Sequence, residues 1–371
     1  MDKPGNPRWI EAGFRPDLID KKLSVWLDHF RWVSALMVAA SHTRNLLMPD
    51  AHPGLLWPEK ILYFFTLFAT EAVVIFFVLS GLLVGGTIVR RTRANTFVLS
   101  DYFIDRAARL YIVLLPALLL SLALQWAGQS LRCLHPDSFG RILGNLVFLQ
   151  NFRIAPPLCN NTPLWTLSSE AFFYLLAPLL LIAFSRRSPI AYAACGVLIA
   201  ASLATYVADR SWTGFGLLLW FAGLIPWFLR LRIPAPVMAL PVLAILMLTR
   251  FHLIGGRISE VILALAFALL LASDFSAART PFAKSAAVFA GFSYSLYAIH
   301  MPIAQAIALH TGFQGLPSGR ASTYLAYAAT LVSMVALGWT FGRLFEARTG
   351  FLRRTMHGFI DGSSRPSRVR T

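Results

Sequence analysis

The chain has 371 residues, of which 57% are hydrophobic and only 13% are charged, and its mean hydropathy is +0.63. Because soluble proteins carry about 25% charged residues, this composition excludes an ordinary soluble protein. The net charge of +16 does not indicate a nucleic-acid-binding protein, since the basic residues lie in connections between apolar stretches and not on one soluble face.

In chain order, the first 28 residues are polar and lack the apolar core of a signal peptide. We expect residues 1–28 to be a cytoplasmic tail, 29–345 an all-α polytopic membrane domain, and 346–371 a basic, partly disordered cytoplasmic tail. Apolar stretches near the ~20 residues that span a bilayer recur along the chain. They predict about ten transmembrane helices, at 29–48, 61–85, 104–126, 163–184, 189–207, 213–229, 234–250, 257–273, 287–309 and 321–345.

The distribution of Lys and Arg predicts the orientation of these helices. If the N-terminus is cytoplasmic, the cytoplasmic segments hold 24 of the 33 basic residues and the opposite side holds nine. An excess of Lys and Arg in short connections marks the cytoplasmic side of a membrane protein. Both termini are therefore expected on the cytoplasmic side of a bacterial inner membrane.

The external connection 127–162 contains a weakly apolar piece that is too short to span a bilayer. We interpret it as a re-entrant or interfacial segment, which requires packing against protein. Cys133 and Cys159 both lie in this connection, on the oxidising side if the membrane is a bacterial inner membrane. They form either a disulfide or two unpaired thiols, and no spacing of Cys and His indicates a metal site.

Ionisable residues inside predicted spans are costly and are therefore functional candidates. Arg31 and His42 lie on one face of the first span, roughly 16 Å apart along its axis. Glu170 comes at about the depth of His42, where a carboxylate can orient a histidine that acts as a general base. A lipid-anchoring Arg and a structurally satisfied His are the alternative interpretation of the first pair.

Arg106 and Arg109 are neighbours at the cytoplasmic start of the third span, where they form either a phosphate clamp or ordinary membrane anchors. Glu71 and His300 are further buried candidates. Together these residues suit a donor with a phosphorylated head and a long arm that enters from the cytoplasm, such as an acyl-CoA. Because no serine nucleophile motif is present, we expect direct transfer with a histidine base.

These residues also carry a family resemblance. The segments that carry it are LDHFRWVSALMVAASH with Arg31 and His42, VIFFVLSGLLVGG with Ser80, DRAARLY with Arg106 and Arg109, PLWTLSSEAFFYLLAP with Trp165, Ser168, Glu170 and Tyr174, and FSYSLYAIHMP with Tyr297 and His300. In this order and spacing the chain resembles the membrane-bound acyltransferase family 3, from Leu27 to about Glu346. Ala171 departs from the family pattern, which leaves Glu170 as the only carboxylate of its motif.

The resemblance implies an O-acyltransferase of sugars or cell-surface polysaccharides. It implies that His42 is the general base, oriented by Glu170, and that Arg31, Arg106 and Arg109 hold the donor's phosphates. The donor is expected to be acyl-CoA, most simply acetyl-CoA, used as a co-substrate with no permanently bound cofactor. The expected acceptor is a glycan or lipid-linked glycan, and membrane lipids are the other partners. Pocket candidates are Glu71, Ser80, Trp165, Ser168, Tyr174, Tyr297 and His300.

Two other functions stay open from the sequence. Ten helices with buried charges also fit a transporter of a glycan intermediate or organic acid, although such proteins often show internal repeats that this chain lacks. A non-catalytic membrane scaffold is the third possibility. The sequence does not identify the acceptor hydroxyl or the oligomeric state.

Overall fold

The computed structural model describes residues 14–48, 54–55, 57–131, 133, 135–152, 156–186, 188–209, 212–251, 253–313, 315–316 and 320–363. Every regular element of these residues is helical, as the apolar composition predicts. The longer helices are α2 (Lys21–Leu47), α3 (Trp57–Thr66), α4 (Ala69–Ser80), α5 (Gly86–Arg93), α6 (Leu99–Trp126), α7 (Phe139–Leu146), α8 (Trp165–Arg186), α9 (Pro189–Asp209), α10 (Trp212–Ala222), α12 (Ala235–Arg250), α13 (Gly256–Ala272), α14 (Ala283–Ala290), α15 (Ser293–Thr311), α16 (Ala321–Leu344) and α17 (Thr349–Ser363).

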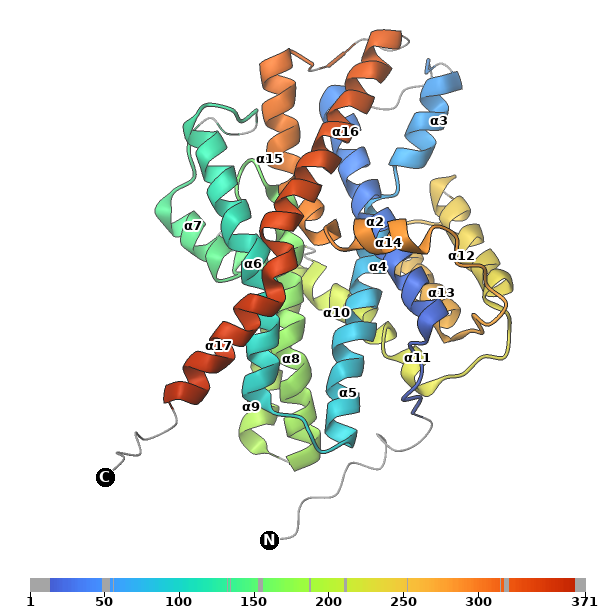
Figure 1. The fold of residues 1–371 in the computed structure, drawn as a ribbon, viewed down its shortest axis with the longest axis vertical. Coiled ribbons are helices and arrows are strands. Elements are labelled where there is room, and N and C mark those ends of the chain that lie inside the picture. The colour runs from blue at the N-terminus through green and yellow to red at the C-terminus, as the bar shows by residue number, and fades with distance from the viewer. Residues whose placement is uncertain are drawn as a thin grey trace.

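Helix α2 runs through the middle of the bundle, where α4, α14, α15 and α16 pack around it (Figure 1). It begins at Lys21, before the boundary predicted at residue 29, because the Asp20 side chain caps it by accepting a hydrogen bond from the backbone N–H of Leu23 at 2.7 Å. Burial among other helices explains how α2 carries many polar residues, since these side chains face protein and not lipid.

Not every predicted span is one straight helix. In the described residues, four helices are long and apolar enough to cross a membrane, or five if the bent pair α14–α15 counts as one span. These two helices meet at 56°, so the span predicted over 287–309 is broken at Gly291 and Phe292. Three shorter apolar helices lie within 189–204, 213–228 and 235–250. The ten-span count and the orientation therefore stay predictions.

The second predicted span is also irregular. A π-helix, Gly81–Gly85, joins α4 to α5, and such insertions occur often at functional sites. The backbone of α10 approaches it so closely that a Cβ atom on Gly81 would lie 1.8 Å from the carbonyl oxygen of Trp220. The glycine thus permits the contact that places α10 behind Ser80.

We expect Gly81→Ala to destabilise the protein, because the new methyl group meets rigid backbone; overpacking commonly costs about 1–3 kcal/mol. The measurement is the midpoint of thermal unfolding of the purified chain in detergent. Gly140→Ala is the matched control, since no atom lies within 4 Å of the added carbon there. Equal midpoints for the two variants would contradict this account of the contact.

The connection 127–162 folds back onto the bundle and does not cross it. It contains α7 and a 3₁₀ turn, Gln150–Phe152, both too short to span a bilayer. The structure joins Cys133 and Cys159 in a disulfide. Between them, Asp137 accepts hydrogen bonds from the Gln125 side chain at 2.8 Å and from the Cys159 backbone at 3.1 Å. These contacts fix the connection against α6.

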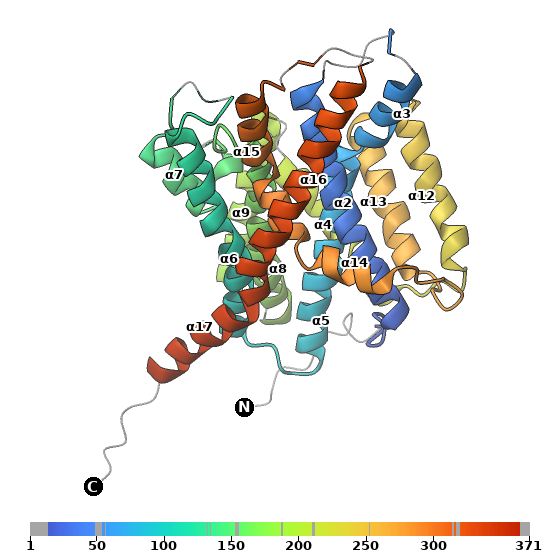
Figure 2. The same cartoon turned by 45° about the horizontal axis from the view of Figure 1, so that its top comes forward.

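The segment predicted as a partly disordered tail is largely helical. Helix α17 follows α16 after a short 3₁₀ turn and packs on the first turns of α6 (Figure 2). Residues 364–371, at the end of this predicted tail, lie outside the described residues, so partial disorder of 346–371 stays a prediction. Helix α17 contributes to the cavity described below.

Candidate active site

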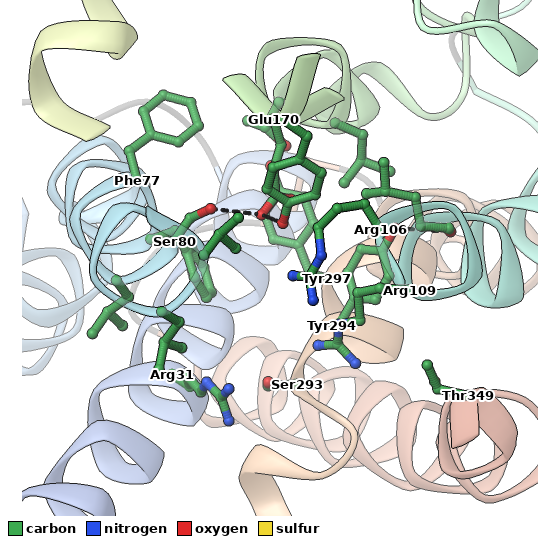
Figure 3. Close-up of a pocket in the computed structure, with 18 of the residues that line it drawn as sticks. Arg31, Phe77, Ser80, Arg106, Arg109, Glu170, Ser293, Tyr294, Tyr297 and Thr349 are labelled. Carbon is green, nitrogen blue, oxygen red and sulfur yellow. Dashed lines mark hydrogen bonds between the residues drawn. The ribbon is translucent and has the colours of Figure 1, made fainter. Parts of the chain in front are cut away.

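A cavity of about 650 Å³ opens between α2, α4, α6, α8, α15 and α17 (Figure 3). Seven residues singled out from the sequence line it: Arg31, Ser80, Arg106, Arg109, Glu170, Tyr174 and Tyr297. They come from five different helices. The structure therefore brings together side chains that are widely separated in the chain.

Of the three cavity arginines predicted from the sequence, two have carboxylate partners. Arg109 forms an ion pair with Glu346 at 2.9 Å and lies over the ring of Tyr294. Glu346 is buried, and its second oxygen accepts hydrogen bonds from the backbone and the hydroxyl of Ser295, each at 2.9 Å. Arg31 contacts Asp28 at 3.4 Å, from the same face of α2. These pairs orient the two guanidinium groups toward the cavity.

Arg106 differs from its neighbours. Its guanidinium lies over the rings of Tyr174 and Tyr102, at 5.6 and 6.0 Å from their centroids. No acidic side chain among the described residues pairs with it, and its buried Nε has no hydrogen-bond partner there. A cation held by aromatic faces and lacking a counter-ion is prepared to bind an anion.

Glu170 lines the cavity from α8. Its Oε1 accepts hydrogen bonds from Ser80 at 3.0 Å and from the hydroxyl of Tyr174, and Trp220 donates to Ser80 at 3.2 Å. A contact between Glu170 and His42 is therefore not seen in this structure, and a role of Glu170 in orienting His42 stays a prediction. The two residues share a depth, but Glu170 projects from α8 toward α4 and orients Tyr174 beneath Arg106.

His42 is instead beside His300. Its Nδ1 lies 2.8 Å from Nε2 of His300, and the two rings are nearly parallel with centroids 5.1 Å apart. Nδ1 of His300 lies 2.6 Å from the carbonyl oxygen of Tyr297. His300 is fully buried, with 0% of its surface exposed.

This chain of contacts determines the tautomers. A carbonyl oxygen only accepts hydrogen bonds, so Nδ1 of His300 carries the proton. In neutral His300, which burial favours, Nε2 is then an acceptor, and Nδ1 of His42 must donate to it. In a neutral His42 the lone pair is then on Nε2.

The cavity ends one helical turn before this histidine pair. Its wall there is formed by Thr166 and Tyr297, whose hydroxyl groups are 2.8 Å apart, and Tyr297 also donates to the carbonyl of Pro163 at 3.0 Å. His42 and His300 do not line the cavity in this structure. The arginines thus line the cavity, and the histidine pair lies beyond its Thr166 and Tyr297 wall.

The comparison with protein families identifies the family of this chain. The acyltransferase domain model of family 3 matches residues 24–343. The chain belongs to acyltransferase family 3. No curated protein and no solved structure matches it significantly. The match contains all the residues named so far in this subsection except Glu346, and it ends before α17 begins at Thr349.

Besides His300, three predicted pocket residues of this acyltransferase lie outside the cavity. Glu71 is on the face of α4 that turns away from the cavity, and its electrostatic neighbours are Glu260 and Arg250. Ser168 donates to the backbone of Phe148 at 2.6 Å, and Trp165 packs edge-on against Phe77. The last two contacts stabilise the start of α8 and do not contribute to the cavity of the acyltransferase.

Other cavity residues of the acyltransferase were not predicted. Thr349, Gly350 and Arg353 come from α17, and Asp105 from the first turns of α6. The signal for α17 was available, because Leu352 and Met356 recur at helical spacing, but the basic composition of the tail concealed it.

Proposed function

We propose that this membrane acyltransferase is an O-acyltransferase that moves an acyl group from cytoplasmic acyl-CoA to a hydroxyl group of a cell-surface or exported glycan. The observation that carries the proposal is a cavity lined by arginines, with a histidine pair beyond its Thr166 and Tyr297 wall; we propose one path that leads from the arginines to the histidines. Acetyl-CoA is the proposed donor and a bacterial inner membrane the proposed location. The arginine end then faces the cytoplasm, where acyl-CoA is available.

In the proposed reaction, Nε2 of His42 removes the proton from the acceptor hydroxyl group as its oxygen attacks the thioester carbonyl carbon. A carbon–oxygen bond forms and a tetrahedral intermediate results. The intermediate collapses by breaking the carbon–sulfur bond, and the proton on His42 passes to the departing thiolate of coenzyme A. The products are the acyl ester and free coenzyme A, so no covalent enzyme intermediate is required.

His300 takes the positioning role that the sequence suggested for Glu170. By accepting the hydrogen bond from Nδ1 of His42, it keeps the lone pair of that ring on Nε2 and stabilises the imidazolium formed during proton transfer. Glu170 then belongs to the donor side of the site, where it holds Tyr174 against Arg106. The hydrogen bonds of His300 and Glu170 support both proposed roles.

The proposal is tested with membranes that contain the protein, radiolabelled acetyl-CoA and a glycan fraction from the same cells. We expect label to appear in the glycan as a base-labile ester, and membranes without the protein to transfer none. Movement of a glycan or organic acid across proteoliposomes without consumption of acetyl-CoA would overturn the proposal in favour of a transporter. Mass spectrometry of surface glycans from a deletion strain, searched for one lost acyl increment, identifies the acceptor.

A further inference from the structure

Helix α17 contributes a fourth arginine to the cavity. Arg353 lines it together with Thr349 and Gly350, at the cytoplasmic end of the proposed path. The Arg353 side chain is 50% exposed, whereas those of Arg31 and Arg109 are 36% exposed. Arg353 therefore lies at the rim of the cavity, outside the three arginines assigned to the donor.

The partner of Arg353 is shared with other cationic groups. Nε of Arg353 is 3.7 Å from Oδ1 of Asp105, which is longer than the usual 2.7–2.9 Å of a charge-assisted hydrogen bond. The other oxygen of Asp105 accepts from Arg91 at 3.3 Å, and Nε2 of His357 lies 3.8 Å from Oδ1. One carboxylate thus serves two guanidinium groups and an imidazole, and neutralises only part of their charge. Arg353 can turn from Asp105 to a stronger anion without leaving a buried charge unpaired.

We propose that Arg353 binds the 3′-phosphate of coenzyme A and makes the enzyme selective for that group. This inference rests on the proposed function, in which acyl-CoA is the donor. Along coenzyme A the order of groups is thioester, pantetheine arm, pyrophosphate and ribose 3′-phosphate. With the thioester toward His42 and the pyrophosphate beside Arg106 and Arg109, the 3′-phosphate is the last anionic group and reaches the rim.

The experiment compares the affinities of coenzyme A and 3′-dephospho-coenzyme A for the full chain in detergent, by titration calorimetry. This measurement needs no acceptor. We expect the wild type to bind coenzyme A about tenfold more tightly, the gain typical of one hydrogen-bonded ion pair. R353Q should remove most of this preference and R353K should retain part of it. R354Q is the matched control, because Arg354 is exposed on the same helix and does not line the cavity.

The ratio of the two affinities is the readout, so a general loss of binding is not mistaken for the effect. Equal affinities in the wild type would overturn the 3′-phosphate site while leaving acyl-CoA as the donor. An equal loss of preference in R353Q and R354Q would also overturn it, in favour of general surface charge. Failure of the wild type to bind coenzyme A at all would overturn the donor assignment, and this inference with it.

Discussion

His42→Ala is expected to reduce acyl transfer by about 10²- to 10⁴-fold, the usual contribution of a positioned general base. The loss should appear in kcat, because His42 lies beyond the end of the cavity and contributes nothing to the phosphate contacts of the donor. The affinity for coenzyme A, measured by titration calorimetry, should stay within about twofold of the wild-type value, which is a small change in binding free energy. Transfer by His42→Ala membranes at the wild-type rate would exclude the mechanism.

Two variants of His300 separate its positioning role from simple packing. His300→Gln can place its amide oxygen near the position of Nε2 and accept from His42, whereas His300→Phe retains only a ring. We expect the Phe variant to lose nearly as much activity as His42→Ala and the Gln variant to recover a measurable part. Equal activities of the two variants, with both folded, would show that the hydrogen bond to His42 does not matter.

Arg106→Ala is expected to weaken donor binding by roughly 10- to 100-fold, since a hydrogen bond to a charged group contributes about 1.5–3 kcal/mol. The effect should exceed that of either neighbouring arginine, because Arg106 has no acidic partner to lose among the described residues. The measurement is the KM for acetyl-CoA, supported by the Kd for coenzyme A.

Two further variants complete this test. Arg106→Lys should recover part of the affinity, because a lysine keeps the charge but not the planar pair of donors. Arg343→Ala is the control for general charge, since this residue is exposed at the end of α16 near Trp339 and does not line the cavity. A KM for Arg106→Ala that matches the control would remove Arg106 from the donor site.

Much of the fold was predictable because the length of an apolar stretch indicates where a helix forms in a membrane protein. The irregularities of these helices were not predictable. The π-helix at Gly81 exists where α10 approaches from 140 residues away in the chain, and no local pattern reports such a contact. The early start of α2 was visible in principle, since Asp20 precedes an amphipathic run, but the apolar stretch alone set the boundary at residue 29.

The candidate site was predicted in part for a similar reason. The cost of burying charge singled out Arg31, Arg106, Arg109 and Glu170, and all four line one cavity. Depth in the bilayer, however, does not specify which way a side chain points around its helix. Because the sequence does not give this direction, Glu170 was paired with His42, and Glu71 was placed in a pocket that it does not face.

Glu346 contacts both a donor arginine and α15, the helix that carries His300. Its one oxygen holds Arg109, while its other oxygen anchors the first turn of α15, the helix that carries His300 about 7.5 Å further along its axis. The first turn of α15 is therefore held by the same carboxylate that holds a donor arginine. A substitution of Glu346 would shift His300 relative to Arg109, and the match between the length of the donor and the position of the base would be lost.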